Sequence, residues 1–196
     1  MRILLAPDSF KEAASAEAIA QAMARGIKRG DPQAECRLLP LSDGGEGLTH
    51  ALVHATGGTL HNVETVDAVV ARLLRSSGFL AISTLPVPPW SSWLRQADLS
   101  RSPLLTVIRW LASTFGTGLL IRAAIDAGAN RIVLGLGGSA TTDGGTGLAH
   151  AFGFRFLDAH DSDIPLGGGA LVDLARIDDS RVSDSIKNVP IVLACD

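Results

Sequence analysis

One arrangement recurs along this sequence: a short apolar run, then a loop of glycines, hydroxyl side chains and carboxylates, then a segment with helical periodicity. Residues 131–145 show the first two parts most clearly. Strands that alternate with helices pack into sheets covered by helices, and continuous apolar runs are typical of buried parallel strands. The sequence therefore predicts an α/β fold with largely parallel sheets and flanking helices.

The expected elements follow from periodicity and from helix stop signals. Ser15 is the expected N-cap of a first helix, which Gly30 and Pro32 should end. A second helix should start at Leu48 with Leu48, Leu52 and Ala55 facing inward, a third should cover 118–127, and a short fourth should end at Phe152. Strands are expected over 2–6, 35–41, 59–66, 131–136, 154–157 and 190–194, and a polar loop over 158–169.

Bulk composition excludes several classes of protein. The formal net charge of −3 gives no general attraction to nucleic acid or to an anionic membrane. Apolar runs stay well below the roughly 18 residues of a membrane span, and the N-terminus lacks a secretory signal. Cys36 and Cys195 are far apart and suggest no disulfide framework. We expect a cytoplasmic protein with no nucleic-acid or membrane partner and leave its oligomeric state open.

Four aspartates share one context, because each follows a predicted apolar strand: Asp8, Asp43, Asp143 and Asp196. Ligands of open parallel sheets bind at the carboxyl ends of strands, so these carboxylates are expected to converge on one cleft. Grouped carboxylates require a metal ion or a cationic partner, and Lys11 is the nearest candidate. The alternative is that each aspartate caps a helix or stabilises a turn.

The loop 137–145 is the most specific local feature. Its glycines allow backbone N–H groups to approach an anion, Ser139, Thr141 and Thr142 add hydroxyl donors, and a helix follows. It matches neither the Walker A pattern nor the dinucleotide fingerprint, which argues against a dehydrogenase. Residues 42–47, with Glu46 at the helix start, and residues 113–118 form two similar loops. Three such loops suggest a ligand with several phosphate groups.

At these loops the sequence resembles the bacterial glycerate kinase family. The matching segments are 6–12 (APDSFKE), 42–47 (SDGGEG), 113–118 (STFGTG), 135–145, 165–169 (PLGGG) and 194–196 (ACD). The resemblance runs in register over 1–67 and 111–196. It implies a two-domain α/β enzyme with one domain inserted in the other, incomplete here, that transfers the γ-phosphoryl group of ATP to D-glycerate with Mg²⁺. The 2-hydroxyl is favoured as acceptor.

The resemblance also implies site residues. Lys11 would neutralise phosphate or hold the glycerate carboxylate, and Asp8, Asp43 or Asp143 would act as base or magnesium ligand, with Mg²⁺ bound through Asp43 or Asp143. The substrate- and ATP-binding set is Ser9, Gly44, Gly45, Glu46, Thr114, Gly116, Thr117, Gly137, Gly138, Ser139, Thr141 and Asp196.

Two features depart from the family pattern. Family members are roughly twice as long, so we expect 1–67 to be the first part of one α/β domain and 111–196 part of a second, truncated one. The alternative function is a non-catalytic remnant that at most binds nucleotide. The window 68–110 is rich in Trp, Pro and Arg and does not resemble the family. A linker would explain it, but we interpret it as the product of two compensating frameshifts.

Overall fold

The computed structural model describes residues 1–10, 13–42, 48–66, 75–82, 92–94, 109–136 and 141–194. Its strands are β1 (Arg2–Leu5), β2 (Glu35–Leu38), β3 (Thr59–Val66), β4 (Arg75–Ile82), β5 (Ser92–Leu94), β6 (Ile132–Gly135), β7 (Arg155–Leu157), β8 (Arg176–Asp178) and β9 (Ile191–Ala194). Its helices are α1 (Ala16–Gly30), α2 (Leu48–Thr56), α3 (Phe115–Asp126), α4 (Thr146–Ala151) and α5 (Asp184–Lys187), with 3₁₀ turns η2 (Arg109–Leu111) and η3 (Gly168–Asp173).

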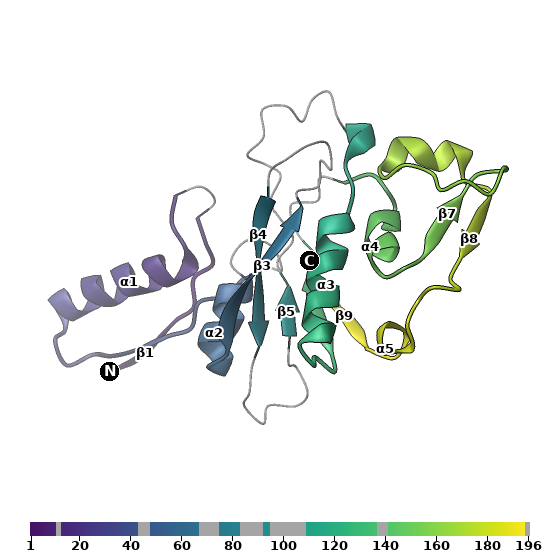
Figure 1. The fold of residues 1–196 in the computed structure, drawn as a ribbon. Coiled ribbons are helices and arrows are strands. Elements are labelled where there is room, and N and C mark those ends of the chain that lie inside the picture. The colour runs from purple at the N-terminus through teal and green to yellow at the C-terminus, as the bar shows by residue number, and fades with distance from the viewer. Residues whose placement is uncertain are drawn as a thin grey trace.

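Strands β1 and β2 pair in parallel and pack against α1, on the left of Figure 1. The N-cap prediction for α1 is confirmed, because the Ser15 hydroxyl accepts a hydrogen bond from the Ala18 amide at 3.2 Å and the helix ends at Gly30. Strand β2 is shorter than expected and ends at Leu38. The Leu39 and Leu41 amides still donate to the Leu5 and Pro7 carbonyl oxygens, at 2.8 and 2.9 Å, but Pro7 has no N–H to donate in return, so regular pairing ends there.

The main sheet has five strands in the order β3-β4-β5-β6-β9. Strands β5, β6 and β9 are parallel, whereas β4 is antiparallel to both of its neighbours. The predicted α/β class is confirmed, and the antiparallel pairings make this sheet mixed. The sheet takes strands from 59–66, from the atypical window 68–110 and from the region after 110. The Pro-rich run 86–90 lies outside the described residues.

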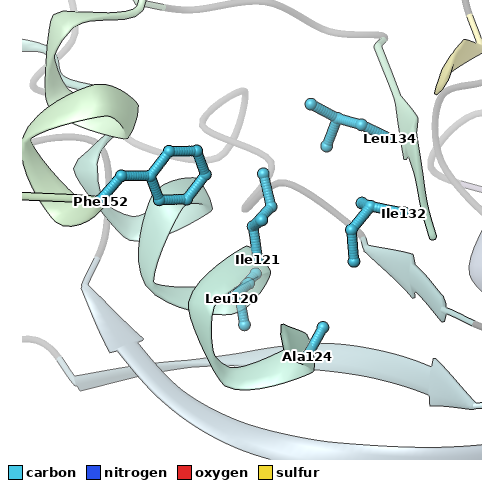
Figure 2. Packing of buried hydrophobic residues seen from close by; sticks show 6 residues of the cluster. All are labelled: Leu120, Ile121, Ala124, Ile132, Leu134 and Phe152. Carbon is cyan, nitrogen blue, oxygen red and sulfur yellow. The ribbon is translucent and has the colours of Figure 1, made fainter. Parts of the chain in front are cut away.

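Helices α2 and α3 cover opposite faces of this sheet. Leu120, Ile121 and Ala124 of α3 pack on Ile132 and Leu134 of β6, with Phe152 closing the cluster (Figure 2). Val133, between those two β6 residues, points to the other face and packs against Leu52 and Val53 of α2. Full burial of a leucine or isoleucine side chain stabilises a fold by about 1.5–3 kcal/mol.

Two sequence expectations about the helices are wrong in detail. Ala55 is exposed and Thr49 is buried instead, because the sheet-facing side of α2 runs through positions 49, 52 and 53. Helix α3 begins at Phe115, three residues before the expected start at 118. Its early start follows from a cap that lies 29 positions away in the sequence, at Asp143.

Beyond α4 the chain forms a small antiparallel pair, β7 and β8, followed by α5. No clear pattern in the sequence predicts β8, η3 or α5, since each of the three spans six residues or fewer. Charged pairs connect the two strands and their loops. Arg155 of β7 holds Asp163 through two hydrogen bonds of 2.8 and 3.0 Å, and Arg176 of β8 holds Asp161 at 2.7 Å. These local ion pairs therefore connect β7, β8 and their loops, a unit whose sequence has little regular apolar pattern.

Candidate functional site

The carboxyl ends of the parallel strands and the N-termini of two helices lie at the same edge of the main sheet. Strand β3 begins soon after α2 ends, and β6 begins after the short turn that follows α3, so each helix runs antiparallel to the strand after it. Strands β3, β5, β6 and β9 share one direction. The N-termini of α2 and α3 therefore lie toward the edge where ligands of parallel sheets bind.

Asp143 is the centre of the hydrogen-bonded part of this edge. Its side chain is 1% exposed. Oxygen Oδ2 accepts from the Thr114 amide at 2.7 Å and from the Gly147 amide at 3.1 Å, and Oδ1 accepts from the Gly145 amide at 3.1 Å. The carboxylate thus satisfies donors at the starts of both α3 and α4, which otherwise have no intrahelical partner.

The Thr114 hydroxyl completes this link. It donates to Asp143 Oδ2 at 3.0 Å and accepts from the Leu148 amide of α4 at 2.9 Å. Thr114 was predicted to bind ligand and Asp143 to be catalytic. The structure brings the two together, and the geometry matches the alternative left open for Asp143, an aspartate that caps a helix. Base or magnesium-ligand chemistry at Asp143 stays a prediction.

Close backbone packing explains several glycines of these loops. A Cβ at Gly147 would meet the Ser113 hydroxyl, and would lie 2.6 Å from the Phe115 nitrogen. A Cβ at Gly116 would collide with the Val66 carbonyl oxygen at the carboxyl end of β3. Gly116 and Thr117 lie inside the first turn of α3, and Thr117 is buried. The contacts of Gly116 are those of helix-on-strand packing, and its predicted part in ligand binding stays untested.

The glycine loop 165–169 reaches the same region. A Cβ at Gly168 would meet the Thr142 carbonyl oxygen and would lie 2.7 Å from the Thr142 hydroxyl. Gly167 has φ of 106° and lies against the backbone of Trp110 and Leu111. The described part of the loop 137–145, residues 141–145, is therefore in contact with two other segments singled out in the sequence, 113–118 and 165–169. Thr141 lies in this cluster and is half-buried.

The other strand-end residues lie at the carboxyl ends of β1 and β2. The Leu41 amide donates to the Pro7 carbonyl oxygen at 2.9 Å, which holds the two strand ends together. Asp8 is exposed, and its Oδ1 accepts from the Ser9 amide at 2.6 Å. Strand β1 thus ends beside β2, and β6 ends beside β9.

The structure leaves part of the predicted site untested. Nine residues lie outside the described ranges: Lys11, Asp43, Gly44, Gly45, Glu46, Gly137, Gly138, Ser139 and Asp196. Within those ranges, no group of three or more His, Cys, Asp or Glu side chains is placed to hold a metal ion. In the same part of the chain, no helix is both long and apolar enough to cross a lipid bilayer.

Sequence analysis missed two contributors to the cluster around Asp143. Ser113 is 1% exposed, and its hydroxyl accepts from the Phe115 amide at 3.2 Å. Gly147 admits the close approach of α4 to the start of α3. Ser113 lies in the noted segment 113–118 but was not among the named site residues. Gly147 was not marked by any sequence pattern, because its close contacts with Ser113 and Phe115 depend on residues more than 30 positions earlier in the chain.

Comparison with known proteins decides the family. The sequence pattern of the Glycerate kinase family matches residues 3–196. Glycerate kinase from Bacillus subtilis (strain 168) is 42% identical over 100% of this chain and 50% of its own length. The chain belongs to the glycerate kinase family. Glycerate 2-kinase from Escherichia coli (strain K12) is 36% identical over 100% of this chain and 51% of its own length.

Solved structures agree with this family. The crystal structure of a glycerate kinase 2 from Salmonella typhimurium LT2 matches with a TM-score of 0.82 at 38% identity, over 100% of this chain and 52% of that one. This glycerate kinase family chain thus spans about half the length of the relatives it matches. The shared half contains the loops around Asp143 and the strand ends that carry Asp8 and Asp43.

Proposed function

We propose that the chain belongs to a kinase that transfers the γ-phosphoryl group of ATP to D-glycerate. The observation that carries this proposal is the gathering of the loops 113–118, 141–145 and 165–169 at the edge toward which α2 and α3 direct their N-termini. Helix N-termini and glycine-rich backbone favour phosphate oxygens. One relative is named a glycerate 2-kinase, which supports the 2-hydroxyl as acceptor.

The chemistry needs positioning and charge neutralisation more than covalent participation. Lys11 would offset phosphate charge or hold the glycerate carboxylate, and Asp8 or Asp43 would orient the attacking hydroxyl. Asp143 and Thr114 would hold the starts of α3 and α4 in place for the bound phosphates. Glycines 137 and 138 and the hydroxyls of Ser139 and Thr141 would contact phosphate directly.

Magnesium is the cofactor this reaction implies, and it would neutralise charge on the phosphate oxygens. Asp143 fits a metal ligand poorly, because both of its oxygens already accept backbone hydrogen bonds. Asp43, outside the described residues, is the remaining candidate from the sequence. A cytoplasmic location likewise stays a prediction.

An ADP-release assay coupled to D-glycerate tests the proposal. We expect ADP release that depends on both ATP and D-glycerate, with 2-phosphoglycerate as product by NMR. The assay is run on the 196-residue chain and on a gene extended to the length of its relatives. Absence of glycerate-dependent ADP release from both proteins would refute the function.

The alternative is a non-catalytic remnant that at most binds nucleotide. Activity in the extended protein alone would support this alternative for the chain itself. Nucleotide binding by the chain in the absence of turnover would support it further.

A further inference from the structure

The Thr49 hydroxyl is buried without a hydrogen-bond partner within the described part of the chain. The residue is 1% exposed, and Oγ1 has no donor or acceptor in reach. A buried hydroxyl without a partner destabilises a fold, so native structures rarely keep one without a reason. Thr56, on the same helix, shows the ordinary arrangement, since its hydroxyl donates to the Leu52 carbonyl oxygen at 2.7 Å.

The position of Thr49 places this hydroxyl near the proposed ligand edge. Thr49 is the second residue of α2, a helix of nine residues. It lies three and four positions before Leu52 and Val53, which pack on Val133 of β6, so it shares their sheet-facing side. The Cα–Cβ bond of a helical residue tilts toward the helix N-terminus. The hydroxyl therefore points toward the N-terminus of α2, at the carboxyl edge of the parallel strands of the main sheet.

The chemistry of that position favours an anionic oxygen. The first amide N–H groups of a helix have no intrahelical acceptor, and the helix dipole places partial positive charge there. A threonine hydroxyl beside them adds one more donor. We propose that Thr49 is a ligand-binding residue, whose hydroxyl donates a hydrogen bond to a phosphate or carboxylate oxygen bound at the N-terminus of α2. This inference rests on the proposed kinase function, and nothing in the sequence had singled out Thr49.

The test compares Thr49→Val, Thr49→Ser and Thr56→Val with the unmodified chain. Valine keeps the shape of threonine and removes the hydroxyl, whereas serine keeps the hydroxyl. Binding of ATP, inorganic phosphate and D-glycerate is measured by calorimetry, and the melting temperature is measured without ligand. Binding of ATP and phosphate alone identifies a nucleotide phosphate as the group held, and binding of D-glycerate alone identifies the carboxylate.

We expect Thr49→Val to weaken binding about tenfold, the effect of one hydrogen bond to a charged group, while its ligand-free melting temperature rises. Thr49→Ser should bind within about twofold of the unmodified chain. The control Thr56→Val should melt at a lower temperature and bind normally, because its hydroxyl is already satisfied within α2.

A higher melting temperature together with weaker ligand binding in Thr49→Val is a combination that loss of a purely structural hydroxyl would not produce. Unchanged binding by Thr49→Val, with normal binding by the unmodified chain, overturns this inference alone. Weaker ligand-free stability of Thr49→Val also overturns it, because the hydroxyl would then have an internal partner such as a buried water. An unmodified chain that binds none of the three probes overturns this inference and, for this chain, the proposed function with it.

Discussion

Asp143 and Thr114 are joined twice, since the aspartate carboxylate accepts hydrogen bonds from both the amide, at 2.7 Å, and the hydroxyl, at 3.0 Å, of a threonine 29 positions earlier. Thr114 is the N-cap of α3, and Asp143 lies two residues before Gly145, the N-cap of α4. Their contact fixes the relative position of two loops that the family resemblance placed near the phosphates. Loss of the Asp143 carboxylate should therefore lower the stability of the fold, whether or not the residue also takes part in catalysis.

Asp143→Asn should lower the free energy of unfolding by about 2–4 kcal/mol. The variant places an NH₂ group among backbone N–H donors, and a buried hydrogen bond to a charged group contributes about 1.5–3 kcal/mol. Urea unfolding followed by circular dichroism measures the change. Asp126→Asn is the matched control, because that carboxylate is 71% exposed and 4.0 Å from Arg122. The control should change stability by less than about 0.5 kcal/mol. Equal effects of the two substitutions would contradict the central role of Asp143.

The effect of replacing a glycine by alanine on stability should depend on the position of the glycine. Gly147→Ala should destabilise the protein by about 2 kcal/mol or more, because its Cβ would lie 2.6 Å from the Phe115 nitrogen and 2.7 Å from Asp143 Oδ2. Gly26→Ala, within α1, meets nothing within 4 Å and should stabilise that helix by about 0.5–1 kcal/mol. Thermal unfolding of both variants checks the two signs, and a stable Gly147→Ala would show that α4 has room to move away.

The sequence predicted the elements whose signals are local. The Ser15 cap, the strand 59–66 and the alternation of strands and helices needed only neighbouring residues. The start of α3 was misplaced because its cap is the distant carboxylate of Asp143. The burial of Thr49 in place of Ala55 depended on which side of α2 meets Val133. The start of α3 and the buried side of α2 therefore depend on contacts between segments far apart in the sequence, which local patterns do not reveal.

Acidification should weaken the β7–β8 unit through Asp163. The Arg155 guanidinium hydrogen-bonds this carboxyl and is the main cause that holds its pKa below the usual value of about 3.9. A carboxylate with a lowered pKa in the folded state contributes stability above its ordinary pKa and loses it as the pH falls through the folded value. Arg155→Gln should raise the pKa of Asp163 toward the ordinary value of an aspartate, measured by NMR titration of the carboxyl carbon.

Asp158 is the internal control for that titration. Its pKa is also lowered, chiefly by the backbone N–H groups of Ser162 and His160, which donate at 2.9 and 2.8 Å. Because those donors do not depend on Arg155, the Asp158 pKa should stay low in Arg155→Gln. A parallel rise of both pKa values would indicate that the substitution unfolds the loop and that Arg155 does not act on Asp163 alone.

The coding sequence of the window 68–110 should carry two compensating frameshifts. Read one frame over, codons for Val87–Leu94 can give a run like Ala-Val-Val-Glu-Leu-Ala, which suits a strand leading into a helix. The family match spans the window, and β4 and β5 place strands within it, so the structure permits either reading. Resequencing of the gene checks the expectation. A read that confirms the present frame throughout would rule out a sequencing error.

Lys11 and Asp43 should carry the chemistry if the proposed roles are right. In a protein extended to the length of its relatives, Lys11→Ala and Asp43→Ala should each lower kcat/KM by about 10²–10³ or more. Without Lys11 the charge of the transition state would lack a compensating cation, and without Asp43 the attacking hydroxyl would not be oriented. Lys28→Ala, at the exposed end of α1, is the matched control and should remain near normal. Steady-state ADP release with D-glycerate measures all three. Near-normal kcat/KM in both Lys11→Ala and Asp43→Ala would refute these roles, while a fall confined to KM would assign the residue to ground-state binding of ATP or D-glycerate.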